Sequence, residues 1–360
     1  MATDITPEDI ASTELLLGVS YTPQERALML DTFEGQIAAA TQLRAVSFDN
    51  IEPMACRFDP RLPGFVMPDP TNDLHWWDTT AEPLPDNDED IAFANVTQLS
   101  GWIAAGVLTS RRLCEIYLER IARIGQQLEC FATVTSDLAL SQADKADRLA
   151  MNGQLLGPLH GIPYVVKDLF DTAGITTGWG AEPFQDRVPD SDATVVQRLR
   201  DAGAVLLGKA AVGGRVRNPW NLNEGSSGSS AGSAAATAAG LCSFSIGTET
   251  LGSITSRCQR CGTTGLRQTF GRVPRKGAMA WCWSMDKVGP ICRSVEDTRL
   301  VLAAINGASA DNPSSIQAGL QFDANAILDG LKVGFLPKAF GEGATSVDHA
   351  ALKTMRGLAV

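Results

Sequence analysis

Apolar residues recur at helical spacing near the start of the chain, over residues 24–45 (QERALMLDTFEGQIAAATQLRA), and this spacing predicts a helix there. A Pro- and Asp-rich passage with little periodicity follows, from Asp49 to Asp90. Regular alternation of apolar and polar positions begins after it. We therefore expect two parts: a helical N-terminal extension with a surface arm over 1–90, and one larger domain over 91–360.

Within 91–360 the pattern switches repeatedly between helical spacing and short apolar runs. Helices are predicted near 96–106, 110–124, 137–151, 192–202 and 295–306, and from about Ser346. Strands are predicted at Cys130–Thr135, Pro163–Lys167, Ala204–Leu207 and Leu331–Leu336, with several more through 263–292. Strands that alternate with helices indicate an α/β fold, in which helices cover both faces of one sheet.

The tract from Gly225 to Ser253 (GSSGSSAGSAAATAAGLCSFSIGTETLGS) is the most informative segment. Its first half has the composition of a flexible linker. However, the run 233–239 favours a helix that Ser229 or Ser230 caps and Gly240 ends, and the run 241–246 alternates like a buried strand. A glycine-rich loop that leads into a helix exposes backbone N–H groups, which makes the tract a candidate site.

Lys167 is the second candidate residue, because it ends the apolar strand 163–167. Loops at the end of a sheet commonly carry function. Two alternatives are a buried stem with its ammonium reaching solvent and an ion pair with the neighbouring Asp168.

Composition narrows the function classes. The chain has 360 residues, 44% of them hydrophobic, and a formal charge of −11, so it is globular and has no basic surface for direct nucleic-acid binding. No signal peptide and no apolar run of about 18 residues is present, and we expect no membrane span and a cytoplasmic protein.

Cysteine and histidine give no convincing metal site. The eight cysteines are expected to be free thiols, and the pair Cys258 and Cys261 has no second pair at zinc-ribbon spacing. His75, His160 and His349 are scattered and are interpreted as ordinary packed or surface histidines. We expect no metal and no cofactor.

Six blocks, in order along the chain, resemble the amidase signature family. They are GIPYVVKDLFDTAG at 161–174, NPWN at 218–221, GSSAGSAAATAAG at 228–240, GTETLGS at 247–253, CGTTGLRQTFGRV at 261–273 and MDKVGPICRSVED at 285–297. The resemblance covers roughly residues 90 to 360. It implies the fold of that family, a mixed and mostly parallel central sheet with helices on both faces.

The resemblance also implies a Ser–Ser–Lys triad, which falls on Lys167, Ser229 and Ser253. In the family the lysine ends a strand, the bridging serine follows a cis peptide, here after Gly228, and the nucleophile lies in the second glycine turn. A neutral lysine is a plausible base where no histidine is near, provided that burial lowers its pKa. The turn Thr250, Leu251, Gly252 and Ser253 would supply the backbone N–H groups of an oxyanion hole. Ser230 and Glu249 are expected to be structural.

Three departures from the family pattern affect these expectations. Thr255 stands where the family commonly has arginine, the connection between Lys209 and Asn218 is short, and the chain stops at Val360 inside a predicted helix, so we expect that the C-terminal part of the domain is absent.

The leading hypothesis is an amidase that cleaves a small or medium carboxamide through an acyl-enzyme and releases ammonia or an amine. One alternative is the A subunit of a glutamyl-tRNA amidotransferase, acting as a glutaminase. Another is an inactive scaffold or truncated fragment. A homodimer is compatible with each of these hypotheses.

Overall fold

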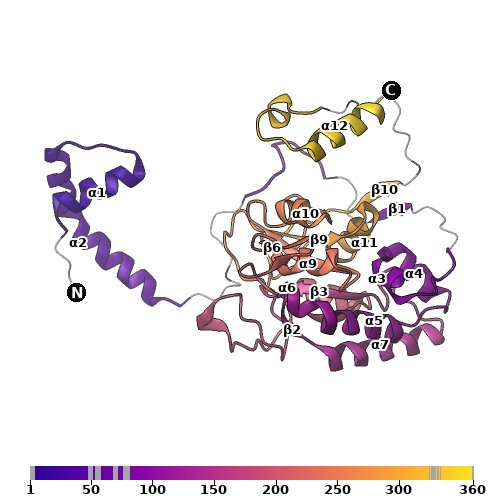
Figure 1. Ribbon diagram of the computed structural model, residues 1–360. Helices are drawn as coiled ribbons and strands as arrows, with labels where there is room; N and C mark the ends of the chain where they lie inside the picture. The colour runs from indigo at the N-terminus through magenta and orange to yellow at the C-terminus, as the bar shows by residue number, and fades with distance from the viewer. Residues whose placement is uncertain are drawn as a thin grey trace.

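The computed structural model describes residues 5–47, 52, 58–67, 72–75, 82–323, 325, 330, 332 and 334–358. Two helices, α1 (Pro7–Leu17) and α2 (Pro23–Ala45), begin the chain and stand away from its remainder in Figure 1. The sequence predicts α2 but not α1. Both begin at a Thr–Pro pair, Thr6 and Thr22, whose hydroxyls accept a hydrogen bond from the third helical residue.

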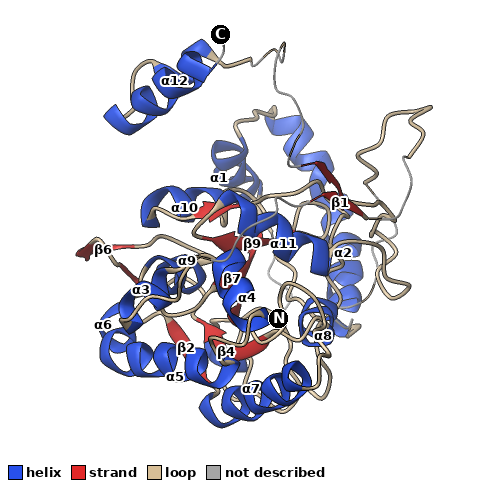
Figure 2. Cartoon of the chain, turned by 90° about the vertical axis from the view of Figure 1, so that its right-hand side faces the viewer, coloured by secondary structure: helices blue, strands red, loops and turns tan. Residues whose placement is uncertain are grey.

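A mixed six-stranded sheet forms the centre of the larger part, in the order β2-β4-β3-β7-β9-β8 (Figure 2). Strand β4 pairs in parallel with β3, and β3 with β7, whereas β2 and β9 run antiparallel to their neighbours. The pairings therefore give β4, β3, β7 and β8 one direction. This mostly parallel sheet, with helices packed around it, confirms the expected fold class. Its strands are β2 (Phe131–Val134), β3 (Pro163–Lys167), β4 (Val205–Ala210), β7 (Phe244–Glu249), β8 (Thr264–Gly265) and β9 (Lys287–Cys292).

The central strands are buried along their whole length. Every residue of β3, β4, β7 and β9 is buried, which explains why their sequences read as short apolar runs without strict alternation. The stacked rings of Tyr164 and Phe244, 5.4 Å apart, join β3 to β7. This core fixes the strand ends where the candidate residues lie.

Most predicted helices are confirmed, with ends displaced by a few residues. The helices are α3 (Asp88–Phe93), α4 (Val96–Ala104), α5 (Ser110–Arg120), α6 (Gln126–Leu128), α7 (Ser136–Met151), α8 (Thr194–Asp201), α9 (Ala231–Ala238), α10 (Thr255–Cys261), α11 (Val295–Ile305) and α12 (Ser346–Leu358). A π-helix (Ile121–Gly125) joins α5 to α6, and 3-10 turns occupy Glu182–Phe184 and Pro337–Phe340.

Four expectations need correction or fall partly outside the described residues. Strand β7 begins at Phe244, three residues after the predicted start, because Leu241–Ser243 complete the turn that follows Gly240. The sequence does not predict α10, which has no strong periodicity. The strand predicted at 331–336 lies partly outside the described residues, and 334–336 do not form a strand. Residues 263–292 contain only β8 and β9, with turns between them.

Two short strand pairings lie outside the main sheet. Strand β1 (Asp73–His75), in the Pro- and Asp-rich passage, pairs in parallel with β10 (Gln321–Asp323). Strands β5 (Arg217–Asn218) and β6 (Asn221–Gly225) form a hairpin directly before the glycine- and serine-rich tract.

Among the described residues, we find no helix long and apolar enough to cross a membrane.

Helix α9 packs unusually close to the sheet. A Cβ on Gly232 would lie 2.3 Å from the carbonyl oxygen of Cys130 and 2.6 Å from the nitrogen of Ala211, so only glycine fits. Thr237 and Ser245 bring their hydroxyls within 2.8 Å of each other between α9 and β7. The small residues that resemble a linker in the sequence are thus interior residues of a packed helix.

Candidate active site

Lys167 lies at the end of β3 with no solvent exposure, and its Nζ reaches two hydroxyls. It donates to Ser229 Oγ at 2.6 Å and to Thr248 Oγ1 at 2.7 Å. The structure therefore brings together Lys167 and Ser229, which are 62 positions apart in the chain.

Burial determines the protonation of Lys167. Removal of its ammonium from water lowers the pKa to about 7, against a partial opposing effect of Asp286 and with a further lowering by Arg257. No ion pair to Lys167 is formed among the described residues. A substantial fraction of this amine is consequently neutral near pH 7 and able to accept a proton.

Thr248 is a site residue that the sequence analysis missed. It lies near the end of β7, whose pairing places Ile246 beside Val166 and so brings Thr248 to the end of β3. Its hydroxyl provides the second polar contact of Lys167. Only the strand register reveals this contact, because neither the type of residue nor its position in the motif distinguishes it.

The alternative pairing of Lys167 with Asp168 is not observed. Asp168 instead faces Lys209, at 3.4 Å, and Lys209 also donates to Phe170 O and Thr177 Oγ1 at 2.6 and 2.7 Å. Burial lowers the pKa of Lys209 to about 8 and raises the pKa of Asp168. Lys209 is thus a second buried lysine, held by a network that leaves Lys167 without a carboxylate partner.

The loop before α9 has the conformation that the resemblance implies. The peptide bond between Gly228 and Ser229 is cis. Ser229 is half-buried, whereas Ser230 is fully buried and occupies the N-cap position of α9. The sequence predicts that Ser229 or Ser230 caps this helix, but the Ser230 hydroxyl forms no cap. It donates to Thr248 O at 3.0 Å and accepts from Thr248 N at 3.2 Å. Ser230 is therefore structural, because it joins the loop to β7.

Glu249 organises the turn that follows β7. Its carboxylate accepts hydrogen bonds from the N–H groups of Ile254 and Thr255 at 2.8 and 2.9 Å. Burial by itself would raise the pKa of Glu249, but the backbone N–H groups of Thr255, Gly252 and Ile254 hold it below its ordinary value. The carboxylate thus stays ionised and fixes the turn, as expected from the sequence.

Ser253 lies within this turn and is half-buried. Its hydroxyl forms no hydrogen bond with Ser229 or Lys167 in the described part of the chain. The backbone N–H groups of Leu251 and Ser253 have no acceptor among the described residues, whereas that of Gly252 interacts with Glu249. Of the predicted oxyanion-hole residues, Leu251 and Ser253 therefore retain free donors at the turn.

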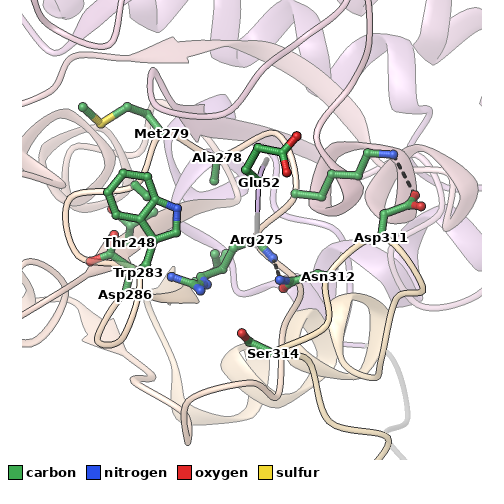
Figure 3. A pocket seen from close by; sticks show the side chains of 13 residues that line it. Glu52, Thr248, Arg275, Ala278, Met279, Trp283, Asp286, Asp311, Asn312 and Ser314 are labelled. Carbon is green, nitrogen blue, oxygen red and sulfur yellow. Dashed lines mark hydrogen bonds and ion pairs between the residues drawn. The ribbon is translucent and has the colours of Figure 1, made fainter. Parts of the chain in front are cut away.

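Asp286 joins this turn to the loop that contains Trp281 and Cys282. One of its carboxylate oxygens accepts from the Thr250 hydroxyl, and the other accepts from Trp281 N and Cys282 N at 2.7 and 3.0 Å. A pocket lies beside this junction, with Thr248, Trp283 and Asp286 close together on one side (Figure 3). Through Thr248 the pocket borders the Lys167 network.

His160, His349 and the Cys258–Cys261 pair lie outside this network. His160 is buried and bonds the backbone at Ala146 O, 2.9 Å away, whereas His349 is exposed on α12. The His75 side chain lies outside the described residues. Burial raises the pKa of the Cys258 thiol to about 11 and that of Cys261 to about 12, and the described residues contain no cluster of metal ligands.

The chain is similar to known proteins over much of its length. The Amidase family matches residues 112–359. The chain is 40% identical over 265 residues to the A subunit of the glutamyl-tRNA(Gln) amidotransferase of Chromohalobacter salexigens, a match that covers 69% of this chain and 54% of that protein.

Solved structures agree with the sequence comparison. The native peptide amidase of Stenotrophomonas maltophilia matches at 38% identity with a TM-score of 0.60, over 62% of this chain and 50% of that one. A fatty acid amide hydrolase matches at 27% identity with a TM-score of 0.57, over 61% and 42%. The chain spans about half the length of the curated relatives that it matches.

Proposed function

Because this chain belongs to the amidase family, we propose that it hydrolyses a carboxamide C–N bond through a Ser–Ser–Lys triad. In this proposal Ser253 is the nucleophile, Ser229 relays protons and Lys167 is the base. Attack of Ser253 Oγ on the amide carbonyl forms a C–O bond, while its proton passes to Ser229 and the Ser229 proton passes to Lys167. The same relay then returns a proton to the leaving nitrogen as the C–N bond breaks.

The observation that carries this proposal is the fully buried Lys167 amine, 2.6 Å from Ser229 Oγ, with a pKa lowered to about 7. A base is most effective when its pKa lies near the working pH. With no carboxylate to hold its proton, Lys167 alternates between its two forms at little cost.

The free N–H groups of Leu251 and Ser253 support an oxyanion hole. As the carbonyl becomes tetrahedral its oxygen gains negative charge, and donors already fixed by the turn stabilise that charge without reorganisation. Thr250 and Gly252 contribute by holding the turn through Asp286 and Glu249. Water then attacks the acyl-enzyme with Lys167 and Ser229 acting again as bases.

A fluorophosphonate probe tests the nucleophile. Wild type should be labelled stoichiometrically and Ser253→Ala not at all. Ser256→Ala, which removes a hydroxyl from the first turn of the adjacent helix α10, is the matched control and should be labelled like wild type. Equal labelling of wild type and Ser253→Ala would exclude Ser253, and no labelling of wild type would favour the inactive-scaffold hypothesis.

Single-turnover acylation tests the base. Lys167→Ala should acylate at least about 100-fold more slowly than wild type, because general-base catalysis contributes roughly 100- to 10,000-fold. An unchanged rate and pH dependence would exclude Lys167 from this role.

A second candidate function is the A subunit of a glutamyl-tRNA amidotransferase, in which the same triad would release ammonia from glutamine for a partner subunit. The 40% identity to the Chromohalobacter salexigens protein favours it, and Thr255, in place of the usual arginine, weighs against it. Glutaminase activity that appears only with the partner subunits would establish this function; hydrolysis of simple amides by the chain alone would support the first proposal.

We also propose that the chain divides at residue 90 into an N-terminal extension and a larger domain. We propose further that the protein is cytoplasmic and does not bind nucleic acid directly. A homodimer is also a proposal, and sedimentation velocity would test it. Limited proteolysis that cleaves between α2 and α3 and leaves a resistant fragment would support the division.

A further inference from the structure

The α1–α2 pair leaves most of its apolar side chains in contact with solvent. Leu15, Leu16 and Leu17, at the end of α1, are 86%, 88% and 70% exposed. Among the described residues of the two helices, Ile10 is the only apolar side chain that is buried. The main contacts of each helix are with the other, and the pair stands away from the rest of the chain (Figure 1). Consecutive exposed leucines beside so small a core indicate a surface that another molecule covers.

The α1–α2 pair is also acidic. Its six carboxylates and two arginines, over residues 5–47, are Glu8, Asp9, Glu14, Glu25, Asp31, Glu34, Arg26 and Arg44. Arg26 is already bound to Glu14 at 2.6 Å. A surface that covers the leucines therefore needs cations next to an apolar hollow, because complementary charge favours the correct partner.

A groove on the larger part of the chain has both properties. It consists of two adjoining pockets of about 560 and 530 Å³, which share Pro60 and Thr269. Residues of the arm 58–67 line both pockets together with residues of the segment 267–272, and we call this hollow the arm groove. Its apolar lining includes Phe58, Leu62, Phe65, Phe270 and Ile316.

The charges of the arm groove are all positive. Its cations are Arg61, Arg267, Arg272 and Lys287, and no carboxylate is among the described residues that line either pocket. Arg61 pairs with Asp59, and Arg267 lies 3.6 Å from Glu249. Arg272 and Lys287 form no ion pair within the described part of the chain; they donate to uncharged oxygens. The groove therefore has an apolar lining and two cations that are available to an acidic partner.

We propose that the arm groove receives the α1–α2 pair of a second copy of this chain. Leu15, Leu16 and Leu17 of one copy then lose contact with water in the groove of the other, and the carboxylates of the pair face Arg272 and Lys287. The helices of each chain stand away from its own remainder, so two copies can exchange them (Figure 1). A twofold axis makes the two contacts equivalent and closes the assembly as a dimer.

The proposed contact lies beside the turn that contains Ser253. Lys287 donates to Thr250 O at 3.1 Å, and Arg267 lies near Glu249, the carboxylate that holds this turn. Association of the two copies is nevertheless independent of the proposed amide hydrolysis, so it can be measured on protein that cleaves no amide.

Sedimentation velocity of the whole chain, from about 1 to 100 μM, tests the proposal on two sets of variants. Leu15→Ser/Leu16→Ser/Leu17→Ser alters the helix pair, and Leu62→Ser/Phe65→Ser alters the groove. Wild type should dimerise, and each variant should dimerise about 100-fold more weakly or worse. All five side chains are exposed, so both variants should keep the circular dichroism spectrum of wild type. Met151→Ser/Val188→Ser removes exposed apolar side chains elsewhere and should dimerise like wild type.

A mixture of the two variants identifies which surfaces meet. The helix-pair variant keeps its groove and the groove variant keeps its leucines, so an equimolar mixture retains one of the two contacts. Dimers should therefore reappear in the mixture although neither variant forms them alone.

Three results would overturn the proposal. Wild type that stays monomeric throughout would mean that the helix pair folds onto its own chain or binds a different protein. A groove variant that dimerises like wild type would mean that the helix pairs bind each other. A mixture that stays monomeric would mean that the leucines and the groove do not meet.

Discussion

Lys167 and Lys209 lie one register position apart on the neighbouring strands β3 and β4, and both are fully buried, yet only Lys209 faces a carboxylate. Lys209 pairs across the strands with Val166, so alternation along the strand directs Lys167 to the opposite face. Asp168 is two residues beyond Val166 and lies on the face of Lys209, which it meets at 3.4 Å. Strand geometry thus separates a structural lysine from a reactive one.

The first prediction concerns the pH dependence of activity. Because burial lowers the pKa of Lys167 to about 7 and the proposed base must be neutral, kcat/KM should rise about tenfold per pH unit below pH 7 and level off above it. Initial rates of amide hydrolysis from about pH 5 to 9 measure this. A flat profile across that range would contradict the assignment.

The second prediction concerns the stability cost of the buried amine. In the unfolded chain Lys167 titrates near its ordinary pKa, about 10.4, whereas in the folded protein it titrates near 7. The stability associated with the neutral amine is therefore complete above about pH 10 and is lost as pH falls to about 7. As pH is lowered from about 10 to about 7, the unfolding free energy of wild type should therefore fall by about 1.4 kcal/mol per pH unit relative to that of Lys167→Met. Urea unfolding of both proteins at several pH values tests the slope.

Urea unfolding of Lys209→Met should show a loss of stability, because Lys209, unlike Lys167, faces a carboxylate. Its removal leaves Asp168 buried without a partner cation, so the variant should lose about 3–5 kcal/mol of unfolding free energy at pH 7. Full stability of Lys209→Met would show that the pair is not structural.

The third prediction concerns Thr248. Thr248→Val preserves shape but removes the hydroxyl that accepts from Lys167 Nζ. Loss of an acceptor for the ammonium disfavours the charged form, so the acid limb of the pH profile should move to lower pH. Its plateau should fall roughly two- to tenfold, as expected for one hydrogen bond. An unchanged limb and plateau would show that Thr248 has no influence on the base.

The fourth prediction concerns Glu249, whose carboxylate holds the turn that contains Ser253. Glu249→Gln removes the charge and leaves one acceptor oxygen for several N–H groups. It should cost about 1.5–3 kcal/mol of unfolding free energy, the range for hydrogen bonds to a charged group, and should slow fluorophosphonate labelling. Normal labelling of a destabilised variant would limit Glu249 to a structural role.

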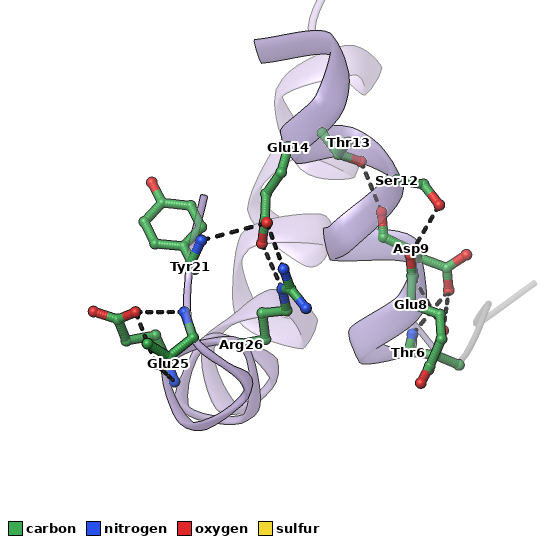
Figure 4. Close-up of polar contacts among 10 residues, drawn as sticks. Thr6, Glu8, Asp9, Ser12, Thr13, Glu14, Tyr21, Glu25 and Arg26 are labelled. Carbon is green, nitrogen blue, oxygen red and sulfur yellow. Dashed lines mark hydrogen bonds and ion pairs between the residues drawn. The ribbon is translucent and has the colours of Figure 1, made fainter. Parts of the chain in front are cut away.

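The fifth prediction concerns the α1–α2 pair. Glu14 is nearly buried between the helices and receives two hydrogen bonds from Arg26, both at 2.6 Å, and one from Tyr21 N (Figure 4). Glu14→Gln should speed amide hydrogen exchange in α1 and α2 roughly tenfold, because it removes the charge-assisted contact between them. Glu34→Gln, at an exposed position of α2, should leave exchange unchanged.

Short-range patterns in the sequence determined much of the secondary structure of this protein and the candidate residues of its site. Apolar runs located β3 and β4, helical spacing located α2, α7 and α11, and Gly240 marked the end of α9, because each depends on residues near one another in the chain. The ordered motifs placed Lys167, Ser229 and Ser253 in one family pattern. The period of apolar residues and the residue types that form turns are properties of short segments, so both can be read directly from the sequence.

The tertiary structure alone decided which groups meet. Thr248 reached Lys167 through the register of β3 and β7, Asp168 was assigned to Lys209 by strand alternation, and Ser230 bonded β7 instead of capping its helix. Burial, pKa and hydrogen-bond competition depend on distances between residues far apart in the chain, and folding sets those distances.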